Sequence, residues 1–322
     1  MLPMCYPSDH YNVNFIPQWA MWFVVELGEY CRERTGAAAK EYQTLCYELL
    51  GWFKKYENEY GLLEHMPGWN FVEWSKANDW TQDVNYPTNM LYSKVLSVMA
   101  DLFEDEALRE QSEKLKQTII EQSFDGSFFV DNAVRNEAGE LIRTENRSET
   151  CQYYAYFFGI ANEKDARFAK LTEILIHVFG PDREKTGELM EIAPANAFIG
   201  NYLRIIILLR MKQFQKVLQD IRGYFSIMAD TTGTLWEHNT LEAGYSGGSL
   251  NHGFASYAGA ALSMALCGIS RLDYVNCIVE LDSDYCAAID YQITIGTPQG
   301  EIKIAEENGI KTVNLPQAWQ IK

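Results

Sequence analysis

Two short segments of the chain carry the residue types best suited to chemistry. They read GTLWEHN over Gly233–Asn239 and SLNHGFAS over Ser249–Ser256. The carboxylate of Glu237 can accept a proton from water, which is what a general base does. Asn251 and His252 offer hydrogen-bonding groups to sugar hydroxyls, and Trp236 offers an aromatic face for a ring. From the residues alone, Glu237 is a candidate general base or else a surface or capping Glu. His252 is likewise a candidate sugar contact or a hydrogen-bonding residue at the start of a helix.

A second group of candidates lies in a short stretch that contains Asn and Gly residues. It holds Trp69, Trp74 and Trp80, together with the acidic residues Glu73 and Asp79. Such a stretch is typical of a loop wall, and we expect it to line a pocket. Inverting hydrolysis of a glycoside needs a second carboxyl group across the sugar from the base. If such a group lay within this chain, it would have to be Asp9, Glu73, Asp79 or Asp83.

Composition and charge exclude several other classes of function. The chain has 322 residues, 47% of them hydrophobic, and a formal net charge of −17. So acidic a protein repels nucleic acids and anionic membranes, and no apolar run approaches the roughly 18 residues of a membrane span. The five His are isolated and no metal-ligand spacing occurs, so we expect no metal and no cofactor. The seven Cys are scattered, which favours free thiols in a reducing compartment.

The elements that must position these residues are helices arranged in pairs. Apolar periodicity predicts helices over 15–34, 37–57, 83–103, 106–122, 147–160, 163–179, 193–211, 214–228 and 250–268. After about residue 273 the periodicity alternates, which predicts strands over 274–281, 291–296, 301–305 and 310–315. We expect almost no strand before residue 272. A sheet of several strands within 83–230 would contradict the fold predicted below, which is a toroid of paired helices.

Helix pairs separated by long loops indicate a mainly α protein of the (α/α)6 toroid type, in which the loops gather at one end. The predicted helices are fewer than six complete pairs, so we expect an incomplete toroid with a small C-terminal β segment. The corresponding domains are an α/α-barrel domain over 1–272 and a β-strand segment over 273–322.

The combined pattern resembles glycoside hydrolase family 78, the α-L-rhamnosidases, which are six-hairpin glycosidases. The Thr-Leu-Trp-Glu step followed by a Ser-x-Asn-His step carries the resemblance most specifically. Further segments that resemble the family over about residues 1–270 are Met1–Trp22, Trp69–Trp74, Phe124–Asn132 and Glu149–Tyr153. The resemblance implies an inverting hydrolase of terminal α-L-rhamnosyl residues, acting on a rhamnose-containing oligosaccharide or glycoside.

The resemblance also assigns roles to residues of this chain. Glu237 matches the general base and His252 matches a residue that contacts the sugar, while Trp236, Trp74 and Trp80 fall in stretches that line the aromatic pocket. Glu73 stands where the family often has Asp. The acid motif of the family is missing, because Arg32-Glu33-Arg34 has similar letters but ends a helix. We therefore expect the general acid upstream of this chain, in a longer enzyme.

Two alternatives remain open from the sequence. A different six-hairpin exo-glycosidase, such as an unsaturated glucuronyl hydrolase, would share the barrel but cleave another linkage. A non-catalytic remnant would bind the sugar without hydrolysing it. We expect a cytoplasmic bacterial protein. Secretion is a second possibility, because the N-terminal part, which could carry a signal, is expected to be missing. The sequence does not predict the oligomeric state.

Overall fold

The computed structural model describes residues 15–33, 37–241 and 247–322. Asp9 and most of the predicted motif within Met1–Trp22 therefore lie outside the described residues. The chain divides into two compact units. Unit 1 comprises 1–31, 35–175 and 189–200, and unit 2 comprises 32–34, 176–188 and 201–322.

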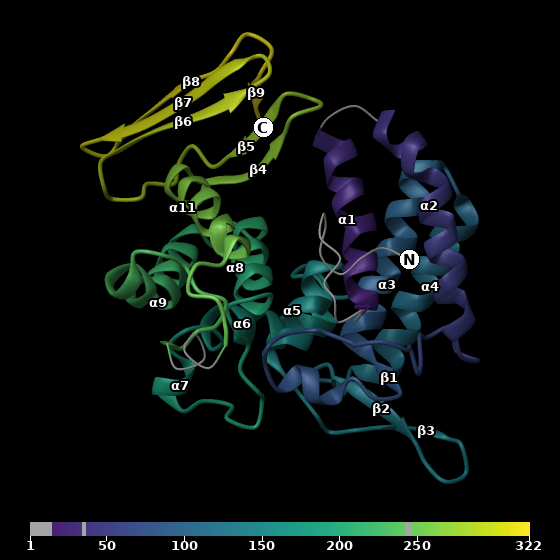
Figure 1. The fold of residues 1–322 in the computed structure, drawn as a ribbon. Helices are drawn as coiled ribbons and strands as arrows, with labels where there is room; N and C mark the ends of the chain where they lie inside the picture. Colours follow the sequence, from purple (N-terminus) through teal and green to yellow (C-terminus); the bar gives the residue numbers. More distant parts are fainter. Residues whose placement is uncertain (1–14, 34–36, 242–246) are drawn as a thin grey trace. The chain divides into compact units, whose positions relative to one another are not determined.

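Unit 1 is built mainly from helices, shown from purple to teal in Figure 1. The α-helices are α1 Pro17–Glu33, α2 Ala37–Phe53, α3 Tyr86–Phe103, α4 Glu106–Ser123, α5 Glu149–Phe157 and most of α6 Ala169–His177. Short 3-10 turns complete the set, namely η1 Lys54–Tyr56, η2 Lys76–Trp80 and η3 Ala166–Phe168.

Helices α3 and α4 show how a pair is made. The two helices pack side by side (Figure 1), joined at Glu104 and Asp105. Glu104 adopts a left-handed conformation that ends α3, and the side chain of Asp105 accepts a hydrogen bond from Leu108 N at 3.2 Å to begin α4. α3 is enclosed on most of its surface, whereas α4 buries only one stripe, namely Leu108, Ser112, Leu115, Ile119 and Ser123. The pair therefore consists of an inner helix and an amphipathic outer helix.

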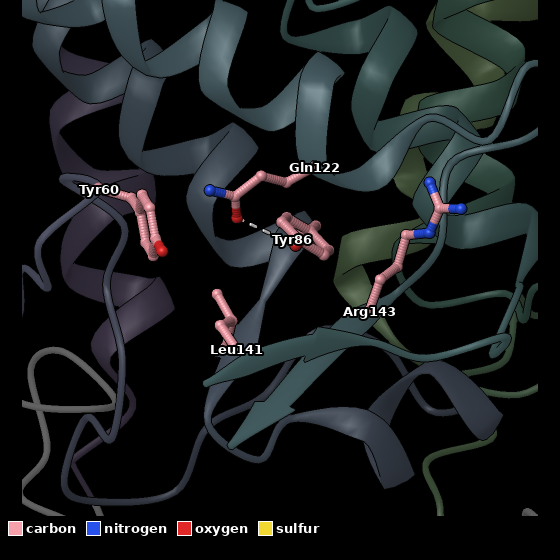
Figure 2. Close-up of a pocket in the computed structure, with 5 residues that line it drawn as sticks. All are labelled: Tyr60, Tyr86, Gln122, Leu141 and Arg143. Carbon is pink, nitrogen blue, oxygen red and sulfur yellow. Dashed lines mark hydrogen bonds between the residues drawn. The ribbon is translucent and has the colours of Figure 1, made fainter. Parts of the chain in front are cut away.

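A three-stranded antiparallel sheet corrects the expectation of helix and loop alone before residue 272. It is formed by β1 Val84–Asn85, β2 Asn132–Arg135 and β3 Leu141–Arg143. This sheet lies within 83–230, where several strands were expected to contradict the toroid. The strands are only two to four residues long and lie in the connections that precede α3 and α5, so the paired helices persist around them, but the toroid itself stays a prediction. Beside this sheet, the Tyr86 hydroxyl donates to Gln122 Oε1 at 3.3 Å and links the start of α3 to the end of α4 (Figure 2).

Unit 2 contains a second group of helices. They are α7 Arg183–Thr186, α8 Gly200–Arg210, α9 Phe214–Thr232, η4 Gly253–Ser256 and α11 Tyr257–Cys267. The first residue of α8, Gly200, belongs to unit 1. Arg204 on α8 and Asp220 on α9 form a fully buried ion pair at 2.7 Å, and Lys216 adds a second cation to Asp220 at 2.9 Å. Removing one partner of such a pair costs about 3–5 kcal/mol, because the other charge stays buried without compensation.

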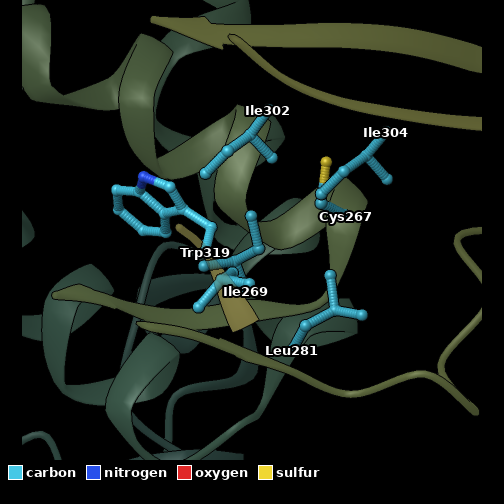
Figure 3. Packing of buried hydrophobic residues seen from close by; sticks show 7 residues of the cluster. Cys267, Ile269, Leu281, Ile302, Ile304 and Trp319 are labelled. Atoms are coloured by element: carbon cyan, nitrogen blue, oxygen red, sulfur yellow. The ribbon is translucent and has the colours of Figure 1, made fainter. Parts of the chain in front are cut away.

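Two three-stranded sheets follow α11. The first contains β4 Ile269–Asp273, β5 Ile278–Leu281 and β9 Gln320–Ile321, and the second contains β6 Tyr291–Thr297, β7 Gly300–Glu307 and β8 Ile310–Asn314. Side chains from both sheets and from the end of α11 share one hydrophobic core, which is drawn in Figure 3: Cys267, Ile269, Val279, Leu281, Ile302, Ile304 and Trp319. The strands are therefore packed on the helical part of unit 2.

These observations confirm a mainly helical protein with a small C-terminal β segment. The strands begin at Ile269 rather than near residue 273, because Gly268 ends α11 in a left-handed conformation and the chain pairs at once with β5. The predicted boundary at 272 lies inside β4, so a separate C-terminal domain stays a prediction. None of the described helices combines the length and apolar character needed to cross a membrane.

Candidate functional site

The predicted general base lies in a loop whose two sides are held together by hydrogen bonds. Gly233 ends α9 in a left-handed conformation, and the chain then runs back beside the segment that precedes η4. Glu237 N donates to Ser249 O at 2.9 Å, and His252 N donates to Leu235 O at 2.8 Å. The Thr234 hydroxyl adds a bond to Leu250 O. These bonds bring the two sequence motifs into direct contact.

Glu237 and His252 face each other across this loop. His252 Nδ1 lies 3.9 Å from Glu237 Oε2. The side chain of His252 is 27% exposed and that of Glu237 is 17% exposed. Ser249 N donates to the same carboxylate oxygen at 2.9 Å and fixes its position. The pair is thus partly open to solvent and anchored by the backbone. A carboxylate held in this way can accept a proton from a water molecule, and the imidazole beside it can hydrogen-bond a hydroxyl group.

The neighbours of this pair differ from one another in exposure. Trp236 is 1% exposed, and its indole N–H donates to Thr232 Oγ1 at 2.7 Å. An indole enclosed in this way presents no open face for stacking, so Trp236 anchors the loop to the end of α9. Asn251 is exposed, and its backbone N–H donates to Ser249 Oγ at 3.2 Å. Its side chain therefore remains a candidate for ligand contact.

The predicted loop wall in unit 1 is an aromatic cluster. Phe71 lies at the centre, with ring centroids 4.8 Å from Trp74 and 5.5 Å from Trp69. Trp19 on α1 and Phe198 before α8 contact Phe71 from the other side, at 5.5 and 5.7 Å. Phe71 is buried, whereas Trp69 and Trp74 are half-buried. The packing holds these rings in place, so they would lose little side-chain entropy when a ligand stacks on them.

Glu73, predicted as a substrate contact, is fully buried beneath this cluster. Its Oε1 accepts a hydrogen bond from Trp74 N at 2.7 Å, and its Oε2 accepts from the backbone N–H groups of Ile199, at 3.0 Å, and Gly200. Burial raises the pKa of Glu73 from 4.5 to about 7, and these backbone donors oppose the rise. The carboxylate caps the first residue of α8, so its hydrogen bonds in this structure serve the protein backbone.

The remaining predicted residues of this stretch lie around η2. Asp79 is exposed, and Trp80 is half-buried with its carbonyl accepting from Asn85 Nδ2 at 3.0 Å. Among the described residues, no group of three His, Cys, Asp or Glu side chains is placed to hold a metal ion.

The structure brings together some of the predicted residues and leaves others separate. Glu237 and His252 meet, and their sequence neighbours Trp236 and Asn251 are buried and exposed, respectively. Glu73, Trp74, Asp79 and Trp80 belong to unit 1, whereas the Glu237 loop belongs to unit 2, so the convergence of the two groups stays a prediction.

Sequence reasoning missed two positioning groups. Ser249, whose backbone N–H holds Glu237, was quoted only as part of a motif, and no side-chain signal marks a backbone donor. Asn196 donates its side-chain amide to Trp74 O over a separation of 122 residues, and a pairing so distant leaves no local trace. The Gly-rich segment between the two motifs is the one available signal for a tight loop at Ser249.

The fold is similar to those of two solved rhamnosidases. A GH78 family rhamnosidase of Bacillus sp. GL1 matches 98% of this chain with a TM-score of 0.80 and 19% identity. A rhamnosidase from Klebsiella oxytoca, solved with rhamnose bound, matches 81% of the chain with a TM-score of 0.58 and 15% identity. This chain spans 34% and 49% of their lengths. The predicted resemblance is thereby confirmed at the level of the fold.

No model of a known protein family and no curated protein matches the sequence.

Proposed function

We propose that this chain is part of a glycoside hydrolase that removes terminal α-L-rhamnosyl residues with inversion, with Glu237 as the general base. The observation that carries the proposal is the Glu237–His252 pair, held 3.9 Å apart and partly exposed. It occurs in a chain whose fold matches that of a rhamnosidase over 98% of its length. The substrate would be a rhamnose-containing oligosaccharide or glycoside.

In the proposed reaction, Glu237 removes a proton from a water molecule that attacks the anomeric carbon. Ser249 N–H holds the carboxylate at 2.9 Å, so its orientation toward the water is fixed before substrate binds. His252 hydrogen-bonds a hydroxyl group of the sugar. The C–O bond to the aglycone breaks as the water oxygen bonds to carbon, and the departing oxygen takes a proton from a general acid.

We place the general acid outside this chain. The chain spans about a third of the length of the Bacillus rhamnosidase, and its sequence holds no acid motif of the expected kind. A positioned acid is typically worth about 10²–10⁴ in rate. The 322-residue chain alone should therefore hydrolyse glycosides with poor leaving groups very slowly.

The test compares two α-L-rhamnosides that differ only in the leaving group. We expect the isolated chain to release little or no p-nitrophenol, and to release 2,4-dinitrophenol slowly, because the dinitrophenolate leaves without protonation. Efficient hydrolysis of the p-nitrophenyl compound would contradict the placement of the acid. Saturable binding of L-rhamnose without hydrolysis of either compound would contradict the glycosidase and favour a sugar-binding role.

A further inference from the structure

A pocket of about 340 Å³ opens in unit 1 beside the small sheet. Its lining comes from four separate segments, shown in Figure 2: Tyr60, Tyr86, Gln122, Leu141 and Arg143. Leu141 and Arg143 are two residues apart on β3, so both point to the same face of the sheet. The volume falls in the range of small-molecule sites, which is roughly 300–1,000 Å³.

The walls of this pocket are held in place by the protein. Tyr60 stands in a tight turn in which Asn58 Oδ1 accepts from Tyr60 N at 3.0 Å and from Leu62 N at 3.1 Å. Asn58 is itself anchored, because its amide donates to Glu64 Oε2 at 2.8 Å. Tyr60 remains 46% exposed although its backbone is fixed. An aromatic ring presented in this way offers a ready platform for stacking.

The polar groups of the pocket can bind an anion and hydroxyl groups. Arg143 Nη1 donates a hydrogen bond of 3.5 Å to Phe124 O, and within the described part of the chain no carboxylate forms an ion pair with Arg143. None of the five lining residues is acidic, although the chain carries a net charge of −17. Gln122 uses its oxygen to accept from Tyr86, which leaves its amide N–H groups as donors.

We propose that this pocket is an accessory binding site for a sugar ring that carries a carboxylate, such as a hexuronic acid. Arg143 would bind the carboxylate, Tyr60 would stack on the ring, and Gln122 would donate to a ring hydroxyl. The planar guanidinium matches a carboxylate through two parallel hydrogen bonds. The proposal concerns a site in unit 1 and does not depend on hydrolysis by Glu237.

The experiment is calorimetric titration of the full chain with methyl β-D-glucuronoside, with methyl β-D-glucoside and benzoate as comparators. We expect the glucuronoside to bind about tenfold or more tightly than either comparator, because only it has both the carboxylate and the hydroxyl groups. Arg143→Gln should remove that advantage, and Tyr60→Ala should weaken binding of both sugars. The matched control is Arg109→Gln, which removes an equal charge from an exposed position on α4.

Several results would overturn the proposal. Equal binding of glucuronoside and glucoside would remove the role of Arg143, and equal binding of benzoate would remove the sugar specificity. Unchanged affinity in Arg143→Gln, or an equal loss in Arg109→Gln, would place the ligand elsewhere. Glu237→Gln separates this site from the proposed catalytic one: retained glucuronoside binding supports the proposal, and its loss contradicts it.

Discussion

At the scale of single residues, three buried or half-buried carboxylates in this chain have different surroundings. Glu237 is partly exposed, with a backbone donor on one side and an imidazole on the other. Glu73 is enclosed and binds backbone N–H groups at the start of α8. Asp131 is enclosed as well, and it accepts a hydrogen bond from the Ser148 hydroxyl at 2.7 Å. Of these three, Glu237 is the one that is partly open to solvent, which is why we propose it as the general base.

Glu73→Gln should destabilise the protein by about 1–3 kcal/mol, since one carboxylate oxygen becomes an amide that faces backbone donors. Urea unfolding followed by circular dichroism measures the change. The matched control is Glu110→Gln on the exposed side of α4, which should leave stability within about 0.5 kcal/mol of the wild type. Equal effects of the two substitutions would show that Glu73 does not cap α8.

The raised pKa of Asp131 should make the free energy of unfolding depend on pH. Burial raises its pKa from 3.8 to about 8, against the opposing hydrogen bonds from Ser148. The folded state therefore binds the proton more tightly than the unfolded state, and the stabilising contribution is full below the unfolded pKa and lost as pH rises toward about 8. In Asp131→Asn this titration is absent, so the variant should gain stability relative to the wild type as pH rises through that window.

The check on Asp131 is the free energy of unfolding of both proteins in urea, measured across that pH window. A constant difference between wild type and variant at every pH would contradict the raised pKa. Glu73 titrates with the same sign, but it is present in both proteins and cancels in the comparison.

The pairing of Glu237 with His252 was predictable from the sequence, because the two motifs are close along the chain and the segment between them contains several Gly residues. The burial of Trp236 was not, since an aromatic residue beside a catalytic candidate serves equally well as a stacking face or as a core residue. The capping role of Glu73 was also hidden, because its partner Ile199 is 126 residues away. Contacts at such separations depend on the fold rather than on local pattern.

At the scale of elements, Lys311 on β8 connects the second sheet to the end of α11. Its Nζ donates to the carbonyl groups of Cys267, at 2.9 Å, of Asp282, at 3.3 Å, and of Tyr285, at 2.5 Å. The same nitrogen lies 5.3 Å from the centre of the Tyr285 ring. A cation at the C-terminal end of a helix is also favoured by the helix dipole. One side chain thus joins a strand, a helix end and a loop.

Lys311→Met should lower the free energy of unfolding by about 1–3 kcal/mol, because it leaves carbonyl groups without their donor while keeping the apolar stem. Thermal and urea unfolding measure the loss. The neighbouring Lys303 on β7 is the matched control, since it is exposed and its Nζ forms an ion pair with the exposed Glu301. If Lys303→Met destabilises as much as Lys311→Met, the loss reflects the removed charge and not the connection to α11.

The helices were predictable because the long amphipathic and apolar segments carry strong periodicity. The predicted 106–122 and 37–57 correspond to α4 and to α2 with η1. The strands β1, β2 and β3 were not predictable, since segments of two to four residues carry too little alternation to be distinguished from a loop. Likewise, α8 begins at Gly200 and not at the predicted 193, because residues before it form the turn that Glu73 caps.

At the scale of the whole molecule, nearly all of this chain matches the fold of a solved rhamnosidase, but the match covers only part of that protein. The chain reproduces the fold of a solved rhamnosidase over 98% of its own length and spans 34% of that protein. A partial match of this kind is compatible with the presence of the base and the absence of its acid. We propose that Glu237 activates water and that the group that protonates the leaving group lies outside this chain.

The most direct test is the rate of hydrolysis of 2,4-dinitrophenyl α-L-rhamnoside by the wild type, Glu237→Gln and Glu188→Gln. Glu188 is exposed in unit 2 and serves as the matched control. We predict that Glu237→Gln abolishes the slow release of dinitrophenol while its thermal midpoint stays near that of the wild type, because the amide oxygen can still accept from Ser249. Glu188→Gln should keep the wild-type rate. Equal rates for the wild type and Glu237→Gln would show that Glu237 is not the base.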